Sequence, residues 1–227
     1  IESVKILIKE EGLFVIEFPY LVDFIEKNLF DTIYHEHLSY LSLRPLKAIF
    51  ERFDMQIIDA KKVDSHGGSL RVYACRRGAH PISDNVRKII EIEEKSGLYS
   101  KEGFIKYKDA VSKSKFELTK ILNKIKEEGY RIVGVGAPAK GNTLLNYCHI
   151  NSDVLDYLAE KSDLKKGLYS PGMHIGGVDE KLLFEEPQPH YALLLAWNLK
   201  DIIIPKLKEK GFRGKFIIPI PIPHIIS

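Results

Sequence analysis

Two imidazoles, a carboxylate and two phenols lie within seven residues of a segment that has no hydrophobic period. They are Tyr34, His35, Glu36 and His37, followed by Tyr40. Histidine titrates near neutral pH and accepts protons from carbon or from hydroxyl groups, and an adjacent carboxylate can orient the ring or raise its pKa. A phenol can donate a hydrogen bond to a developing enolate oxygen. The segment therefore predicts proton abstraction, and a polar loop whose histidines cap backbone groups is the structural alternative.

A glycine pair between two β-rich segments is the second candidate. The string is His66-Gly67-Gly68-Ser69, and Arg71 follows two residues later. Paired glycines let a ligand approach the backbone closely, and a guanidinium can bind a phosphate or carboxylate. The simpler interpretation is a tight turn with a solvent-facing arginine. A zinc site is a weak hypothesis, because the first segment supplies two histidines and only His66 offers a third ligand; we predict no metal.

The third candidate is a turn that follows a predicted strand and opens a helix. Gly134, Gly136 and Ala139 match a loose dinucleotide-binding pattern with Ala in the last place. Backbone N–H groups and the helix dipole attract an anion at such a turn. Further polar donors follow it: Lys140, Asn142 and Thr143. We predict phosphate binding here. Glu160 lies where an acidic ribose ligand would sit, so an NAD-dependent oxidoreductase is an alternative.

Two further groups near expected strand ends are interpreted as structural. One is the turn-rich segment 167–174, which contains Pro-Gly, and the other is Trp197 with Asn198 at the end of an apolar strand. Both are expected near the carboxyl ends of strands, where open α/β sheets bind ligands. As isolated features they favour packing over chemistry.

The elements that must position these residues predict an α/β fold. A helical stripe, a stop at Gly12 and an apolar run over 13–18 are typical of a parallel sheet covered on both faces. The β-rich segments 55–63 and 70–76 are joined closely and are expected to pair antiparallel. Residues 83–128 are rich in Lys, Glu and helix formers, with apolar residues every three or four positions from 104 to 125, which predicts a long connecting helix.

Strands and helices then alternate, which predicts a parallel, doubly wound sheet. The expected strands are 131–136, 154–158, 191–197 and 215–219, and the expected helices are 141–148 and 199–210.

Composition narrows the function classes. The 227 residues are 44% hydrophobic and carry 34 basic and 31 acidic side chains, a net charge of +3. This balance argues against a polycationic nucleic-acid arm and gives no basis for electrostatic membrane binding. Cys75 and Cys148 are too few for a disulfide framework, which favours a cytoplasmic protein. No apolar run reaches the roughly 18 residues of a membrane span, and no signal peptide is evident. Because the chain begins at Ile1, we expect a piece of a longer protein.

Several of these strings together resemble the sugar C-methyltransferase family. The matching segments are 30–40, 66–73 and 136–147, followed in order by 166–174 and 196–198. The resemblance covers nearly the whole chain. Such enzymes use S-adenosylmethionine to methylate a carbon of a nucleotide-linked 4-keto deoxysugar, so the resemblance implies a nucleotide sugar as the partner, with no nucleic acid and no membrane. A non-catalytic nucleotide-sugar binding module is a further alternative.

The resemblance also implies a domain order. Residues 1–80 would be the C-terminal part of a class I methyltransferase-like sheet, 81–128 a helical connector and 129–227 a Rossmann-like, doubly wound domain. The family's zinc would lie in an N-terminal domain, whose cysteine cluster is absent from this sequence. The glycine-rich turn that normally cradles S-adenosylmethionine is also absent. We therefore expect the chain alone to bind the cofactor poorly and to be inactive.

The resemblance assigns roles to individual residues. His37 would remove the proton next to the keto group, with Glu36 supporting it and Tyr34 near a sugar oxygen; the enolate then attacks the methyl sulfonium. We assign the nucleotide diphosphate to a larger set: Lys140, Asn142, Thr143, Arg71 and the turn containing His66, Gly67 and Ser69. An ideal strand over 34–37 would alternate side chains, so we expect irregular or helical backbone that lets Tyr34 and His37 share a face. We further expect the His37 ring to open into the same cleft as the helix start after Ala139.

Overall fold

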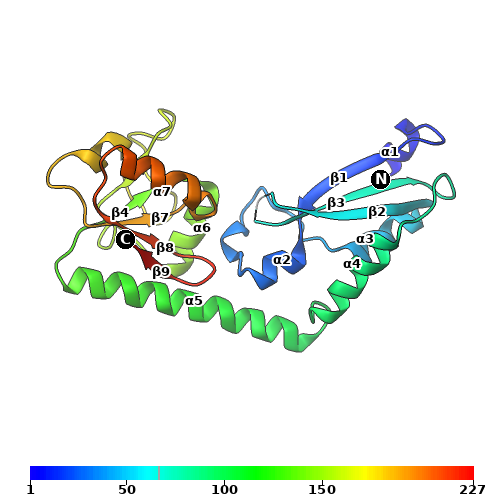
Figure 1. Cartoon of the computed structure of the whole chain (residues 1–227), viewed down its shortest axis with the longest axis horizontal. Coiled ribbons are helices and arrows are strands. Elements are labelled where there is room, and N and C mark those ends of the chain that lie inside the picture. The colour runs from blue at the N-terminus through cyan, green and yellow to red at the C-terminus, as the bar shows by residue number, and fades with distance from the viewer. Residues whose placement is uncertain (66) are drawn as a thin grey trace. The chain divides into compact units, whose positions relative to one another are not determined.

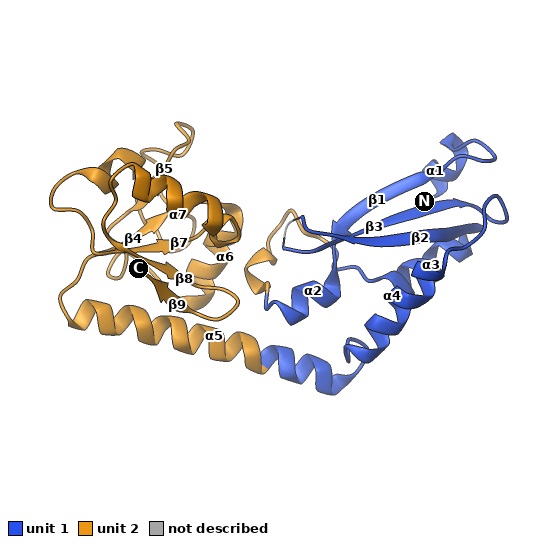
Figure 2. Cartoon of the chain, viewed as in Figure 1, with its two compact units in different colours: residues 1–28, 39–108 blue, residues 29–38, 109–227 orange. Residues whose placement is uncertain are grey.

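The computed structural model describes residues 1–65 and 67–227 and divides the chain into two compact units. Unit 1 comprises residues 1–28 and 39–108, and unit 2 comprises 29–38 and 109–227 (Figure 2). Each unit has its own sheet (Figure 1) and its own hydrophobic cluster. The segment that carries His35 and His37 therefore belongs to the same unit as the doubly wound sheet, although it lies about a hundred residues earlier in the sequence.

Unit 1 is built on an antiparallel sheet of three strands. The strand order is β1 (Phe14–Pro19), β3 (Ser69–Arg76), β2 (Met55–Val63). The predicted pairing of β2 with β3 is confirmed. The expectation that β1 belongs to a doubly covered parallel sheet is wrong, because β1 pairs antiparallel with β3. Its side chains alternate: Val15 is 47% exposed while Phe14 and Ile16 pack on the core, as expected for a sheet covered on one face.

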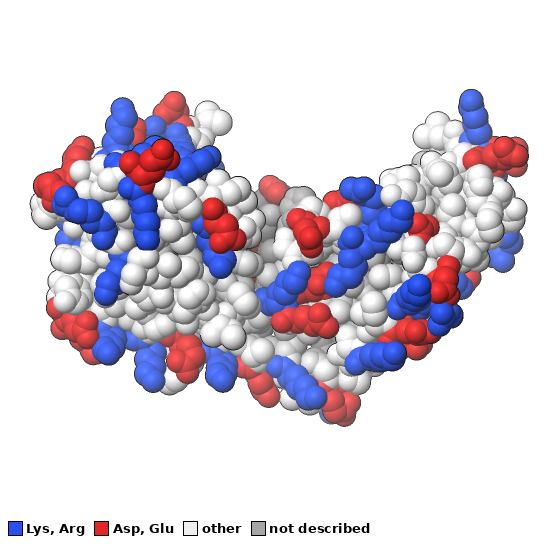
Figure 3. Space-filling view, in the orientation of Figure 1, with Lys and Arg blue, Asp and Glu red and all other residues white. Residues whose placement is uncertain are grey.

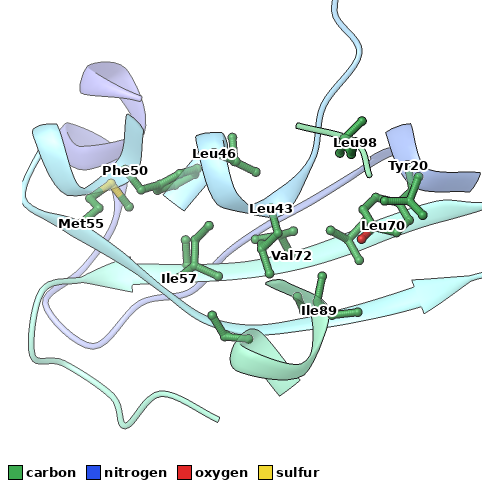
Figure 4. Packing of buried hydrophobic residues seen from close by; sticks show 14 residues of the cluster. Tyr20, Leu43, Leu46, Phe50, Met55, Ile57, Leu70, Val72, Ile89 and Leu98 are labelled. Atoms are coloured by element: carbon green, nitrogen blue, oxygen red, sulfur yellow. The ribbon is translucent and has the colours of Figure 1, made fainter. Parts of the chain in front are cut away.

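Helices cover this sheet and enclose the core of unit 1. They are α1 (Glu2–Leu7), α2 (Leu21–Glu26), α3 (Leu43–Arg52) and α4 (Asp84–Lys95). Both α3 and α4 pack on β2. Leu43 and Phe50 of α3 and Ile89 of α4 meet Ile57 and Val72 of the strands in one cluster (Figure 4).

The predicted long connecting helix is divided in two. After α4 the chain turns over residues 96–100 and continues as α5 (Lys101–Glu127). Gly97 has φ 75° at this break, a conformation that glycine adopts without steric cost. Leu118, Leu122 and Ile125 form the buried stripe of α5 that the spacing predicts. In the described part of the chain, no helix has the length and apolarity to cross a bilayer.

Unit 2 contains the predicted doubly wound sheet. In strand order its described members are β6 (Gly177–Asp179), β5 (Leu158–Glu160), β4 (Ile132–Val135), β7 (Tyr191–Leu194), β8 (Lys215–Ile218) and β9 (His224–Ile226). All neighbours are parallel except β9, which pairs antiparallel with β8. The chain goes from β4 to β5 on one side and later returns to β7 on the other. This reversal creates a switch point at the carboxyl end of β4, where such sheets bind ligands.

Helices α6 (Ala139–Cys148) and α7 (Lys200–Glu209) and three short 3₁₀ helices complete the described elements of unit 2. The 3₁₀ helices are η1 (Phe30–Thr32), η2 (Glu180–Phe184) and η3 (Trp197–Leu199). The strand expected at 154–158 begins at Leu158 instead, because Val154 and Leu155 donate to the carbonyl of Asn151 in a turn. The three-residue strands β6 and β9 are too short for a periodic signal and were not predicted from the sequence.

Candidate catalytic turn and the start of helix α6

Residues 34–37 form an irregular turn, as predicted. The His37 backbone N–H donates to the Tyr34 carbonyl at 2.9 Å, and this bond closes the turn. It places the two side chains on one face, where His37 Nε2 lies 3.1 Å from the Tyr34 hydroxyl and the ring centroids are 4.8 Å apart. Both side chains are half-buried, whereas His35 and Glu36 are exposed. The turn thus presents one imidazole and one phenol together.

The surroundings of Tyr34 favour its neutral form. Burial raises the pKa of the phenol, and the negative charges of Glu36 and Asp31 raise it further. Tyr34 therefore remains a hydrogen-bond donor at neutral pH. When its hydroxyl donates to His37 Nε2, that nitrogen carries the lone pair, and the ring proton resides on Nδ1. The described hydrogen bond of the His37 ring leads to Tyr34 and not to Glu36.

Three contacts hold this turn and the preceding residues on unit 2. Trp197 Nε1 donates to Asp31 Oδ2 at 2.7 Å. Thr143 Oγ1 of α6 donates to the Ile33 carbonyl at 3.3 Å. One turn further along the helix, the ring of Tyr147 lies 5.2 Å from that of Phe30. The structure therefore brings the His37 turn and helix α6 into one unit, and the shared cleft remains a prediction.

Lys140 stands at the start of α6 beside residues from the end of β7. Its ammonium donates to Asn198 Oδ1 and lies 4.5 Å from the centroid of the Trp197 ring. Burial lowers the pKa of Lys140, and the charge of Asp31 opposes that shift. Since β4 and β7 are neighbours, their carboxyl ends bring Lys140 and Trp197 together. Trp197 and Asn198, interpreted from the sequence as structural, thus contact a predicted site residue.

Asn142 faces a different part of the unit. Lys140 and Thr143 are three residues apart and share the helix face toward residues 29–38, as their spacing predicts. Asn142 instead borders a cavity of about 240 Å³, whose wall also includes Ala137, Lys165 and Tyr169. Ala137 follows the carboxyl end of β4, whereas β5 and β6 contribute their first residues, Leu158 and Gly177, to the wall. The three predicted phosphate ligands are therefore divided between two faces of α6.

Glu160 closes the glycine turn from the side of β5. One carboxylate oxygen accepts the Ala137 N–H at 2.8 Å, and the other accepts those of Lys161 and Ser162 at 2.8 and 3.0 Å. Burial raises the pKa of this carboxyl, but the three backbone donors and nearby Lys165 outweigh it and leave the pKa below its usual value. A turn amide that would face a dinucleotide phosphate is therefore occupied by a negative side chain, which argues against the oxidoreductase alternative.

The glycine pair lies in unit 1, where polar contacts hold it as a turn. His66 lies outside the described residues. Lys27 Nζ donates to the Gly67 carbonyl at 2.7 Å, and Ser69 Oγ donates to the Ser65 carbonyl at 3.1 Å. Gly68 has φ 135°, and a Cβ there would lie 2.7 Å from Asp23. The glycine at this position is therefore explained by backbone conformation and close packing.

Arg71 is paired with an acidic residue on the neighbouring strand. Glu17 faces it in the β1–β3 register, and their charged groups lie 2.8 Å apart. On the face shown in Figure 3, acidic and basic side chains are interspersed. Arg71 and the glycine pair thus belong to unit 1, while Lys140, Asn142 and Thr143 belong to unit 2.

Among residues 1–65 and 67–227, no three or more His, Cys, Asp or Glu side chains are grouped so that they could hold an ion. Cys75 and Cys148 are both buried thiols, one in each unit.

Sequence reasoning missed the part that Asp31 plays. This side chain is fully buried and connects the turn to Trp197 across 166 positions of sequence. The sequence shows only that Asp31 is an acidic residue at the start of the aperiodic segment. That Trp197 is its partner becomes evident only from the strand order.

Comparison with known proteins identifies the family. A family model described as the C-methyltransferase C-terminal domain matches residues 64–221. The chain is also 33% identical over 236 aligned residues to the C-methyltransferase NovU of Streptomyces niveus. That alignment covers the whole of this chain and 54% of NovU, so the chain spans about half the length of the curated relative that it matches. The matches agree with the resemblance found in the sequence strings, and the chain belongs to the C-methyltransferase family.

Proposed function

We propose that the chain supplies the general base and part of the sugar-nucleotide site of an S-adenosylmethionine-dependent C-methyltransferase. The substrate is a nucleotide-linked 4-keto deoxysugar, and His37 removes a proton from a carbon next to the keto group. The observation that carries this proposal is the Tyr34–His37 pair, 3.1 Å apart on a turn docked against α6. Family membership supports carbon as the methylated atom.

Proton removal needs two groups, and the turn has both. A carbon next to a ketone is acidic only if the charge that develops on the oxygen is stabilised. Tyr34 remains protonated because burial and nearby negative charge raise its pKa, so it can donate to that oxygen. Once the substrate oxygen takes over the Tyr34 hydrogen bond, the Nε2 lone pair of His37 is released for the proton. Glu36, exposed beside the pair, supports the positive charge that His37 then carries.

S-adenosylmethionine supplies the methyl group in the family. In unit 2 the turn between β4 and α6 has the form that holds such a nucleoside, and Glu160 occupies the place of a ribose-binding carboxylate. The Glu160 carboxylate is already used to hold the backbone N–H groups of Ala137, Lys161 and Ser162, so we do not assign it to the cofactor. The described residues are therefore assigned to the sugar nucleotide, and no methyl-transfer step is assigned to them.

We assign the nucleotide portion to the surroundings of α6. Lys140, with Thr143 on the same face of α6, binds the diphosphate. Asn142, which borders the cavity on the other face, binds the nucleoside. Gly67, Ser69 and Arg71 of unit 1, together with His66, remain candidate substrate residues.

Lys140→Met is expected to weaken binding of dTDP or UDP about 10- to 100-fold, because a charge-assisted contact contributes roughly 1.5–3 kcal/mol. Isothermal titration calorimetry on the chain measures this. Lys206→Met, which removes an exposed lysine of the same unit, is the matched control. Equal affinity in the two variants would show that Lys140 does not contact the diphosphate.

The proposed substrate class is tested with a panel of nucleotide-linked sugars. The intact enzyme is incubated with S-adenosylmethionine and either 4-keto or 4-hydroxy deoxysugar nucleotides, and products are analysed by mass spectrometry and NMR. We expect one added CH₂ on carbon in 4-keto sugars alone. Methylation of the 4-hydroxy sugars, or methylation on oxygen, would contradict the enolate chemistry.

A further inference from the structure

We propose that Asp31 is a positioning residue for the catalytic turn, and that its buried carboxylate, held by the Trp197 indole, fixes the orientation of the Tyr34–His37 pair. This inference rests on the proposed function of His37. It concerns how the base is held and not which atom it deprotonates. Nothing in the sequence pattern requires a carboxylate at position 31, so its role must follow from its surroundings.

The surroundings of Asp31 are costly for a carboxylate. The residue is 0% exposed, Trp197 Nε1 donates to Oδ2 at 2.7 Å, and Oδ1 has no hydrogen-bond partner among the described residues. A buried carboxylate with an unsatisfied oxygen destabilises a fold, and an apolar side chain of similar volume would pack here at lower cost. A polar acceptor kept in such a place points to a task other than packing.

The carboxylate is electrostatically connected to both halves of the site. Burial raises the pKa of Asp31, while the Trp197 hydrogen bond and the charge of Lys140 lower it. The Lys140 ammonium also faces the Trp197 ring and Asn198. In the other direction, the negative charge of Asp31 contributes to the raised pKa of Tyr34. The charge of Asp31 thus acts both on the cation at the helix start and on the phenol of the turn.

Asp31 lies close in sequence to the two residues that its contact with Trp197 would position. Asp31 is in the middle of η1, three residues before Tyr34 and six before His37. Neighbouring anchors are weaker, namely the 3.3 Å bond from Thr143 to Ile33 and the ring contact of Phe30 with Tyr147. The bond to Trp197 is the shortest of these contacts and has a charged acceptor, which makes it the strongest. Loss of this bond should therefore loosen residues 33–38 in particular.

Three variants test this inference. Trp197→Phe removes the indole N–H but keeps a ring beneath Lys140. Asp31→Asn keeps an oxygen that accepts from Trp197 and removes the charge. Asp31→Leu removes both and fills the volume, so it remains informative if Trp197→Phe fails to fold. The readouts are amide hydrogen exchange of residues 33–38 in the chain and, in the intact enzyme, kcat and KM for the keto sugar.

We expect exchange at 33–38 to become about tenfold faster or more in Trp197→Phe and Asp31→Leu, while amides of β7 and β8 keep their protection. We expect kcat to fall at least about tenfold with KM changed less than about threefold, and Asp31→Asn to retain most activity because the bond to Trp197 survives. Unchanged exchange at 33–38, or equal acceleration throughout unit 2, would overturn the proposal. Because the exchange readout needs no methyl transfer, it separates failure of this inference from failure of the His37 assignment.

Discussion

His37→Ala is expected to lower kcat for methyl transfer by about 10²–10⁴-fold, the usual contribution of a positioned general base. The substrate proton then has no acceptor, while the diphosphate and nucleoside contacts on α6 are untouched. Affinity for dTDP or UDP should therefore stay within about twofold, since binding and proton transfer use different groups. Steady-state kinetics of the intact enzyme and calorimetry with the nucleotide give the two numbers.

The chain offers a matched control two residues away. His35 is an exposed imidazole on the same turn, with its ring edge-on to that of Tyr34 at 6.0 Å, and His35→Ala removes the same functional group while the Tyr34–His37 hydrogen bond stays. We expect it to retain activity within about threefold, as for surface substitutions outside a site. Imidazole added to the buffer should partly restore His37→Ala and leave His35→Ala unchanged. Equal losses in both variants would show that the turn acts by shape and not through the His37 ring.

Glu93→Ala is expected to cost about 3 kcal/mol of unfolding free energy, the largest stability effect of any single change considered, since each donor left unsatisfied in a buried site costs roughly 1–3 kcal/mol. Glu93 of α4 is fully buried, and its carboxylate accepts the N–H groups of Leu43 and Arg44 and the Tyr99 hydroxyl. Those amides open α3, which has no side-chain cap of its own. The negative charge at this position also complements the helix dipole.

Urea unfolding monitored by circular dichroism measures this effect. Glu94→Ala is the control, because Glu94 is the exposed next residue of the same helix and should change stability by less than about 0.5 kcal/mol. Glu93→Gln should fall between the two, because the amide oxygen still accepts one bond. Equal stabilities of Glu93→Ala and Glu94→Ala would show that the contacts from α4 do not cap α3.

Local sequence rules predicted the geometry of residues 34–37 well. Tyr34 and His37 are three residues apart, and any turn or helix over that spacing places them on one face. The alternation of apolar segments after residue 130 likewise predicted the parallel sheet of unit 2 and most of its strands.

Features that depend on contacts between residues far apart in the sequence could not be predicted from it. The strand at 14–19 is apolar enough for either sheet type, and only its register with β3 decides that it is antiparallel. The bond from Trp197 to Asp31 depends on where the chain after β7 meets η1. The separation of Asn142 from Lys140 and Thr143 depends on which faces of α6 are covered.

Glu160 shows how a motif can be read in two ways. Its spacing from the glycine turn predicted a ribose ligand. The structure instead uses its carboxylate to satisfy three backbone N–H groups, which a pattern of residue types cannot reveal. Glu160 therefore stabilises the glycine turn, whereas its spacing from that turn predicted that it binds a ribose.

The central claim is that His37 removes a carbon-bound proton of the sugar, and solvent exchange tests it without any methyl donor. A nucleotide-linked 4-keto deoxysugar is incubated with the intact enzyme in D₂O, and the hydrogens next to the keto group are followed by NMR. We predict that one carbon takes up deuterium with the wild type and with His35→Ala. With His37→Ala the rate of deuterium uptake at that carbon should be at least about 100-fold lower. Equal uptake with wild type and His37→Ala would contradict the account.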